Sequence, residues 1–323
     1  MLRTKFTDMF AVQTPIMQGG MQWIGDGAFA AAISNAGALG TITALTFPSP
    51  AALAEEIARC RELTDRPFAV NITTLPSINP PPYDEYRNVI IKSGVTIVET
   101  SGSDPRKFVP LFHDAGIKVI HKVTSVQHAV VAQESGADAI AVVGFEAAGH
   151  PGELDLPLLV LVSTVLRSVD IPVLAAGGLA DGHGLAASLA LGASGILMGT
   201  RFMATAEAPI HDDVKLAIVN SNALSTSLIF RELKNTARVA KNQISENVAA
   251  ILRDGGDFSS VHELVAGSRG RKVYETGDTE AGIWWAGLAQ GLIDDVPTCS
   301  ALIQRIVSEA EGLISTRLPS YVV

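Results

Sequence analysis

The sequence predicts a TIM (β/α)8 barrel with a mainly helical lid domain inserted after the eighth strand. Short apolar runs alternate with helical segments eight times in the first two thirds of the chain. Most of these runs end in small or polar residues, as strands do at the mouth of such a barrel. The alternation stops after residue 202, and the next ninety or so residues are mostly helical in pattern.

The eight expected strands are residues 15–20, 39–45, 68–75, 96–102, 118–124, 139–145, 172–178 and 195–200. Helix-start signals follow them, such as Ser49-Pro50 before residues 51–61 and Asp104-Pro105 before residues 106–115. An open doubly wound sheet is the alternative. It rarely needs eight consecutive units, and no G-x-G-x-x-G fingerprint lies near the start, so the closed barrel is favoured.

The pattern divides the chain into two domains. Residues 1–202 and 297–323 are expected to form the barrel, and residues 203–296 a helical substrate or lid domain. Within the lid, residues 235–248 form the clearest amphipathic stretch and predict a helix, while residues 298–316 predict the closing helix of the barrel. The lid is expected to stand over the mouth.

Composition narrows the class of protein. The chain has 323 residues, 47% of them hydrophobic and 18% charged, which is enough for one large core. Its net charge of −9 argues against nucleic-acid binding. Cys60 and Cys299 lack zinc-site spacing and read as buried thiols, and no metal site is predicted.

The N-terminal residues lack the apolar core of a signal peptide, and the apolar stretch 156–166 is interrupted by Arg167. We therefore expect a cytoplasmic protein without membrane insertion, and small-molecule substrates. The large apolar fraction permits a homodimer.

Two strand ends predict a phosphate site. Gly177 and Gly178 end the expected strand seven, and Gly199 and Thr200 end the expected strand eight. Their backbone N–H groups, with the positive end of a helix starting near residues 181–182, are suited to an anion. Plain tight turns explain the same residues, but phosphate sites after strands seven and eight recur in this fold.

Other strand ends offer further contacts for a planar ligand. Strand one ends in Gln18, Gly19, Gly20 and Met21, where the glycines permit close backbone approach or simply form a tight turn. Thr73, at the end of strand three, can orient a polar ligand edge or cap a turn. Lys122, at the end of strand five, needs an anion or a carboxylate partner unless it is solvated.

His150 is the best catalytic candidate. It lies between Gly149 and Gly152 in the loop after strand six, and Ala148 precedes it. A lone loop histidine is more often structural, so the assignment rests on its place at the mouth. His183 comes just after strand seven, and four histidines are expected on helical surfaces: His113, His128, His211 and His262.

Four segments resemble the nitronate monooxygenase family, and the match covers nearly the whole chain. They are PIMQGGM (15–21), AGHPG (148–152), AGG (176–178) and MGTRF (198–202). Further segments are similar to the bacterial NADH:quinone reductase branch of this family: NITTLP (71–76), TSGSDP (100–105), GD (277–278) and GLID (291–294).

The resemblance implies tightly bound, non-covalent FMN, with NADH as co-substrate. Residues 18–21 and Thr73 would then lie along the flavin, Lys122 would approach its pyrimidine side, and the loop with Ala148, Gly149 and His150 would face its reactive side. Gly177, Gly178, Gly199 and Thr200 would hold the phosphate. The chain departs from the branch at Val143, where an acidic residue is usual, and at Ile78, in an otherwise polar stretch.

The implied reaction is hydride transfer from NADH to the flavin N5, followed by two-electron reduction of a quinone positioned by His150. One alternative is a nitronate monooxygenase that oxidises alkyl nitronates with O2. Another is a flavin-dependent enoyl-acyl-carrier-protein reductase, which needs a basic docking face; Arg231, Lys234, Arg238 and Lys241 lie at helical spacing, more typical of a solvated face. An FMN-binding sensor or structural barrel is the non-enzyme alternative.

Two segments of the expected lid carry further hypotheses. Trp284 and Trp285 either wall an apolar acceptor or pack in the core, with core packing slightly favoured. Residues 267–272 predict either a loop that touches the phosphates of a dinucleotide or a plain surface loop.

Overall fold

A computed structural model describes residues 2–74 and 80–322 and confirms the TIM barrel. Leu75, at the expected end of strand three, and Ile78 lie outside the described residues. All eight expected strands are present and parallel. Their bounds are β1 Ile16–Gln18, β2 Gly40–Thr43, β3 Phe68–Thr73, β4 Ile97–Ser101, β5 Lys118–Val123, β6 Ala139–Val143, β7 Val173–Ala176 and β8 Gly195–Met198.

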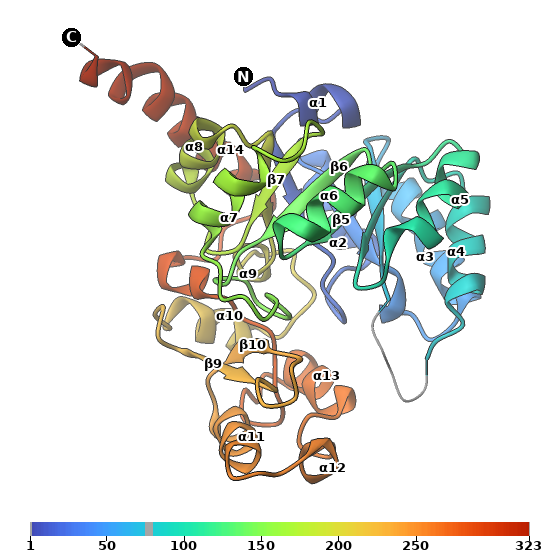
Figure 1. Ribbon diagram of the computed structural model, residues 1–323, viewed down its shortest axis with the longest axis vertical. Helices are drawn as coiled ribbons and strands as arrows, with labels where there is room; N and C mark the ends of the chain where they lie inside the picture. Colours follow the sequence, from blue (N-terminus) through green and yellow to red (C-terminus); the bar gives the residue numbers. More distant parts are fainter. Residues whose placement is uncertain (1, 75–79, 323) are drawn as a thin grey trace.

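The strand order is β1-β8-β7-β6-β5-β4-β3-β2, and Met17 pairs with Leu39 to join the two ends of the sheet. Figure 1 shows the helices around this sheet. They are α2 Gly27–Asn35, η1 Ala44–Thr46, α3 Pro50–Leu63, α4 Tyr83–Lys92, η2 Pro105–Lys107, α5 Val109–Asp114, α6 Val126–Glu134, α7 Leu158–Val165, α8 Gly182–Leu191, α9 Thr200–Met203 and α14 Cys299–Gly312.

The predicted helix starts are confirmed by their caps. The Ser49 side chain accepts a hydrogen bond from the Ala52 N–H, and Pro50 occupies the first turn of α3. The Asp104 side chain caps η2 by accepting from the Arg106 N–H. The expected helix over residues 106–115 is divided between η2 and α5.

One end of the barrel is closed by the N-terminal helix α1 (Lys5–Phe10). Its Phe6 and Phe10 belong to the same buried cluster as the inward-facing Met17, Ile97 and Leu174 of the strands. Several inward-facing residues of this cluster are small: Ala69, Ala139, Ala141 and Ala176. Because α1 occupies the amino ends of the strands, a ligand site is left to the carboxyl ends.

The insert is the segment between α9 and α14, and in Figure 1 it lies below the barrel, at the end where α9 and α10 are found. It contains α10 Asp212–Val219, β9 Thr226–Ile229, β10 Ala237–Ala240, α11 Gln243–Arg253, α12 Phe258–Val261, α13 Gly267–Thr276 and η3 Leu288–Leu292. After α14 come η4 Leu313–Arg317 and η5 Pro319–Tyr321. The insert is mainly helical, as expected, but it also carries an antiparallel hairpin of β9 and β10.

The expectation of one helix over residues 235–248 is wrong. Its first part is strand β10, and α11 begins only after Asn242, whose side chain accepts from the Ser245 N–H. Phe230 and Lys234 have left-handed backbone conformations, with φ of +63° and +52°, at the turn of the hairpin. The amphipathic pattern therefore spans a strand and a helix.

Two other predictions for the insert also need correction. The four cations Arg231, Lys234, Arg238 and Lys241 do not share a helical face, since they lie on the hairpin and its flanks. Residues 267–272 are not a loop, because they form the first turns of α13. The closing helix is confirmed as α14, with the Thr298 side chain as its N-cap.

Within the described residues, no helix has the length and apolar character needed to cross a bilayer. The same part of the chain contains no cluster of histidine, cysteine or acidic side chains arranged to hold a metal ion. Cys60 and Cys299 are buried free thiols, and burial raises the pKa of each to about 12.

Candidate active site

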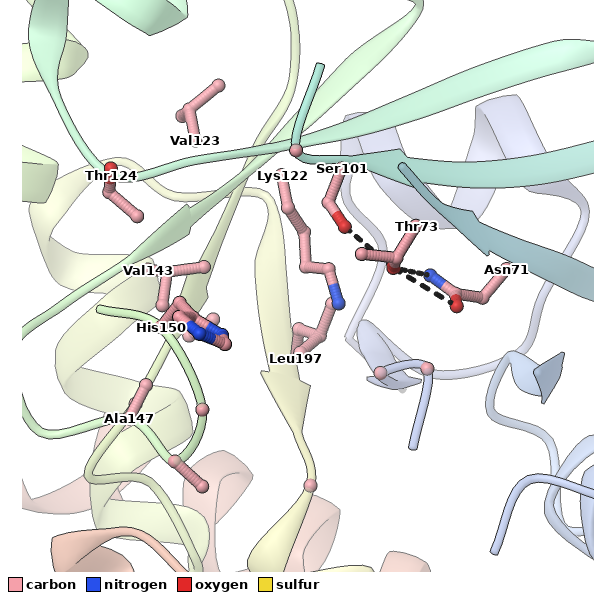
Figure 2. Close-up of a pocket in the computed structure, with 18 of the residues that line it drawn as sticks. Asn71, Thr73, Ser101, Lys122, Val123, Thr124, Val143, Ala147, His150 and Leu197 are labelled. Carbon is pink, nitrogen blue, oxygen red and sulfur yellow. Dashed lines mark hydrogen bonds between the residues drawn. The ribbon is translucent and has the colours of Figure 1, made fainter. Parts of the chain in front are cut away.

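A cavity of about 960 Å³ opens at the carboxyl ends of the strands, a volume at the upper end of ordinary ligand pockets. Its lining contains every candidate site residue except Gln18: Gly19, Gly20, Met21, Thr73, Lys122, Ala148, Gly149, His150, Gly177, Gly178, Gly199 and Thr200. Figure 2 shows Lys122, Thr73 and His150 around the same open space. Residues from six different strand ends are thus brought together.

The expectation for Gln18 requires correction. Its side chain is 0% exposed and does not line the cavity. Gln18 Nε2 donates to the Thr41 carbonyl at 3.1 Å, and Gln18 Oε1 accepts from the Thr41 N–H at 2.9 Å. The amide therefore hydrogen-bonds across the seam between β1 and β2, where few backbone pairs are available, instead of lying along a ligand.

Glu99, on β4, lies beneath the cavity and was not among the predicted site residues. It is 0% exposed, and its Oε2 accepts hydrogen bonds from the Gly20 N–H at 2.9 Å and from Asn71 Nδ2 at 2.7 Å. Lys122 Nζ lies 3.5 Å from the other oxygen, Oε1. The carboxylate partner that a lysine at the mouth requires is therefore Glu99.

Gly20 is required by the close approach of this network. A Cβ atom on Gly20 would lie 2.2 Å from Asn71 Cγ, closer than any real contact allows. Beside it, Thr73 Oγ1 lies 2.8 Å from Ser101 Oγ, which gives the wall next to Lys122 a polar character (Figure 2). The arrangement suits the polar edge of a flat ring.

The expected phosphate cradle has the backbone form that an anion needs. Gly177 and Gly178 have φ of +108° and +69°, which favours glycine, and a Cβ on Gly177 would lie 3.0 Å from the Ala147 nitrogen. Gly199 precedes α9, and Thr200 Oγ1 accepts from the Gly287 N–H at 3.0 Å, leaving its own proton to donate. These residues fit the phosphate of FMN.

The helix after strand seven does not contribute as expected. The N-terminus of α8 is already capped, because Asp181 accepts from the Gly184 N–H and Glu309 accepts from the Gly182 N–H. Neither Asp181 nor Gly182 lines the cavity.

His150 is half-buried in the loop after β6, and its ring centroid lies 5.9 Å from that of Trp285. Burial lowers the pKa of His150 below its ordinary value, with the Glu153 carboxylate acting in the opposite direction. Burial therefore favours the neutral form of the imidazole. Trp285 lines the cavity, where it can wall an apolar ligand. Trp284 is buried away from the cavity and packs in the core.

The His150 loop is joined to the insert by a seam that sequence reasoning missed. Gly149 and Arg238 of β10 exchange two backbone hydrogen bonds. The Gly149 N–H donates to the Arg238 carbonyl at 3.0 Å, and the Arg238 N–H donates to the Gly149 carbonyl at 2.7 Å. Glu153 accepts from both the N–H and the hydroxyl of Thr236 at 2.6 Å. The insert thus holds the loop in place and does not merely cover it.

Arg238 completes this seam. Its side chain is 4% exposed, it donates to the Phe145 carbonyl at 2.9 and 3.1 Å, and it lies 4.6 Å from the centroid of the Phe145 ring. Arg231, nearby on the surface, instead forms a two-bond ion pair with Asp155.

The four histidines that were expected on helical surfaces lie in different surroundings. His113 pairs with Asp138, His128 is exposed on α6 beside the cavity, and His211 and His262 lie at helix ends, as cap residues of α10 and α12. Val143 lines the cavity.

A closed barrel with a glycine cradle, a cation and a histidine at its mouth defines a cofactor-binding barrel enzyme. The family model described as "Nitronate monooxygenase" matches residues 3–309. The chain belongs to the nitronate monooxygenase family and is an oxidoreductase of this family, whose members are FMN-dependent.

Individual relatives have diverse names. A "(3aS,4S,5R,7aS)-5-hydroxy-7a-methyl-1-oxo-octahydro-1H-indene-4-carboxyl-CoA dehydrogenase" of Rhodococcus jostii is 33% identical, with 96% of each chain covered. The structure of FabK from Thermotoga maritima is 35% identical, with a TM-score of 0.93 over 100% of both chains. A nitroalkane oxidase from Streptomyces ansochromogenes is 26% identical, with a TM-score of 0.82 over 97% of this chain and 99% of that one.

Proposed function

We propose that the chain is an FMN-dependent NADH:quinone reductase. The observation that carries this proposal is the packing of the half-buried His150 imidazole against the Trp285 ring, with 5.9 Å between the ring centroids, at the wall of a cavity of about 960 Å³. Figure 2 shows His150, from the loop after β6, and Lys122, from β5, reaching into the same space. A cavity of this size accommodates a flavin and a second flat ring beside it.

FMN, when bound, supplies the group that takes hydride from NADH and passes two electrons on. The chain provides the surroundings. Gly177, Gly178, Gly199 and Thr200, which line the cavity, would hold the phosphate, and Lys122 would lie near the pyrimidine edge. The Trp285 ring offers an apolar surface, and the His150 N–H donates a hydrogen bond to an acceptor oxygen.

The surroundings of His150 and Lys122 favour a neutral quinone over an anionic nitronate. A nitronate is an anion, and an anion beside an imidazole favours its protonated form. Here burial favours the neutral form, and Lys122, a cation that lines the cavity, already has the Glu99 carboxylate within 3.5 Å. A neutral planar acceptor suits these surroundings better.

A second candidate is the oxidation or reduction of an acyl thioester. The carboxyl-CoA dehydrogenase of Rhodococcus jostii supports it through similarity over 96% of this chain. The carrier-protein version lacks the basic face that was expected for it, because Arg231 is paired with Asp155 and Arg238 is buried.

Anaerobic stopped-flow absorbance of the purified protein tests the proposal. We expect NADH to bleach the flavin rapidly and benzoquinone to restore it rapidly. Slow bleaching by NADH with turnover of propyl nitronate in air would assign a nitronate monooxygenase instead. Restoration by an enoyl-CoA but not by benzoquinone would assign the thioester reaction.

His150→Ala tests the role of the histidine. We expect the variant to keep FMN and to lose about 100-fold in the rate of reoxidation by quinone, the lower end of general acid–base effects. His183→Ala is the matched control, because His183 is exposed on α8 and does not line the cavity. Full activity of His150→Ala with every acceptor would remove His150 from the mechanism.

A further inference from the structure

Glu99 is a carboxylate buried under the cavity whose two oxygens have different surroundings. Oε2 accepts from the Gly20 N–H and from Asn71 Nδ2, whereas Oε1 accepts no hydrogen bond from the described residues. The charged group near Oε1 is the Lys122 ammonium, at 3.5 Å. One side of the carboxylate thus fixes the floor of the site, and the other faces its cation.

A glutamine at position 99 would reproduce the first of these roles. Its amide oxygen could accept from the same Gly20 N–H and Asn71 amide at similar distances. Burying a carboxylate costs far more than burying an amide, unless the charge is paired. What the carboxylate adds here is therefore its negative charge, placed next to Lys122.

The negative charge of Glu99 lies near the place where reduction would add negative charge to the bound flavin. The Lys122 side chain is 19% exposed, and its ammonium points into the cavity in Figure 2. A lone ammonium there would stabilise the negative charge that reduction places on the pyrimidine edge of the ring. A carboxylate 3.5 Å behind the ammonium offsets part of that effect.

We propose that Glu99 is a positioning residue that holds the Lys122 ammonium at the edge of the flavin and, by opposing its charge, keeps the reduction potential of the bound flavin low. The inference rests on FMN binding in the proposed function. A low potential makes the reduced flavin a stronger donor to its acceptor.

The test is the reduction potential of the bound flavin, measured by dithionite titration against a reference dye in four holoproteins: wild type, Glu99→Gln, Lys122→Met and the double variant. We expect Glu99→Gln to bind reduced FMN about tenfold tighter relative to oxidised FMN, which is a rise of about 30 mV for a two-electron couple. Lys122→Met is expected to lower the potential. In the Lys122→Met background, Glu99→Gln is expected to shift the potential by less than half of the shift that it causes in the wild-type protein.

Two further variants separate charge from structure. Glu99→Asp keeps the charge but is too short to reach the Gly20 N–H and Lys122 together, so we expect weaker binding of oxidised FMN, which Glu99→Gln retains. Asp138→Asn removes one negative charge at the opposite end of the barrel, where Asp138 accepts from the Val119 N–H. Its potential is expected to equal that of the wild type.

An unchanged or lowered potential in Glu99→Gln would overturn the proposal. An equal rise in the single and double variants would show that Glu99 does not act through Lys122, which also overturns it. The titration uses neither NADH nor quinone, so the outcome stands even if the stopped-flow test assigns another substrate. A wild-type protein that fails to bind FMN would overturn both proposals.

Discussion

Replacing Arg238 with methionine should loosen the His150 loop. The side chain is 4% exposed and joins β10 of the insert to the strand-six loop through the Phe145 carbonyl and the Phe145 ring. Methionine keeps much of the volume and removes both the charge and the donors. In the wild type, Arg238 donates to the Phe145 carbonyl and to the Thr226 hydroxyl, and methionine leaves both acceptors without these hydrogen bonds.

The expected loss of free energy follows from the contacts of Arg238. Hydrogen bonds from a charged donor contribute about 1.5 to 3 kcal/mol each, and a desolvated cation over an aromatic ring about 2 kcal/mol. Burial of the guanidinium, which lowers the pKa of Arg238, offsets part of this sum. A net loss of about 2 kcal/mol corresponds to a roughly 30-fold larger opening constant for the seam.

Hydrogen exchange followed by mass spectrometry measures that opening directly. The reporter amides are Gly149, which donates to the Arg238 carbonyl, and Thr236, which donates to Glu153. We expect peptides that cover them to exchange about 30-fold faster in Arg238→Met, while peptides from β2 to β4 keep their wild-type rates.

Arg231→Met is the matched control, with the same change of charge and shape in the same hairpin. Its ion pair with Asp155 is on the surface, with both side chains over two-fifths exposed, so its loss should cost less than about 1 kcal/mol. Equal exchange in the two variants, or wild-type exchange in Arg238→Met, would refute the reasoning.

Three further outcomes are expected. Gly20→Ala should lower the thermal midpoint and weaken FMN binding by at least about tenfold, because the new Cβ would lie 2.2 Å from Asn71 Cγ; fluorescence titration of the apoprotein with FMN measures this, and wild-type affinity would contradict it. Gly177→Ala should weaken FMN binding with little change in the pH dependence of stability, since its φ of +108° disfavours a side chain. Burial lowers the pKa of His121 to about 4, so the folded state stays neutral while the unfolded state takes up a proton below about pH 6.5. Stability should therefore fall as the pH drops from 6.5 to 4, by up to about 3 kcal/mol, and thermal midpoints should show a smaller fall in His121→Gln.

The barrel could be predicted because its signal is local and repeated. Each strand is a short apolar run with a turn and a helix start after it, and all eight are present within a few residues of their expected bounds. The residues that line the mouth follow from the same rule, since strand ends meet there.

The hairpin was missed because its determinants lie far apart in the sequence. Residues 235–248 have a helical pattern, but Thr236 binds Glu153 and Arg238 binds the loop around Gly149, contacts that no local window contains. Glu99 did leave a signal. A glutamate between Val98 and Thr100, inside an apolar strand, needs partners, and that question would have led to Lys122.

The seam between Gly149 and Arg238 also has a consequence for folding during synthesis, because it joins two segments that are synthesised at different times. The loop that carries His150 leaves the ribosome well before its partner strand β10, and at about 5 to 20 residues per second the delay is of the order of 5 to 20 s. All eight barrel strands are synthesised before β10, and the last two, β7 and β8, are synthesised within that delay. A nascent barrel can thus close while its His150 loop still lacks its partner, and the loop gains its hydrogen bonds to β10 only when the insert has been synthesised.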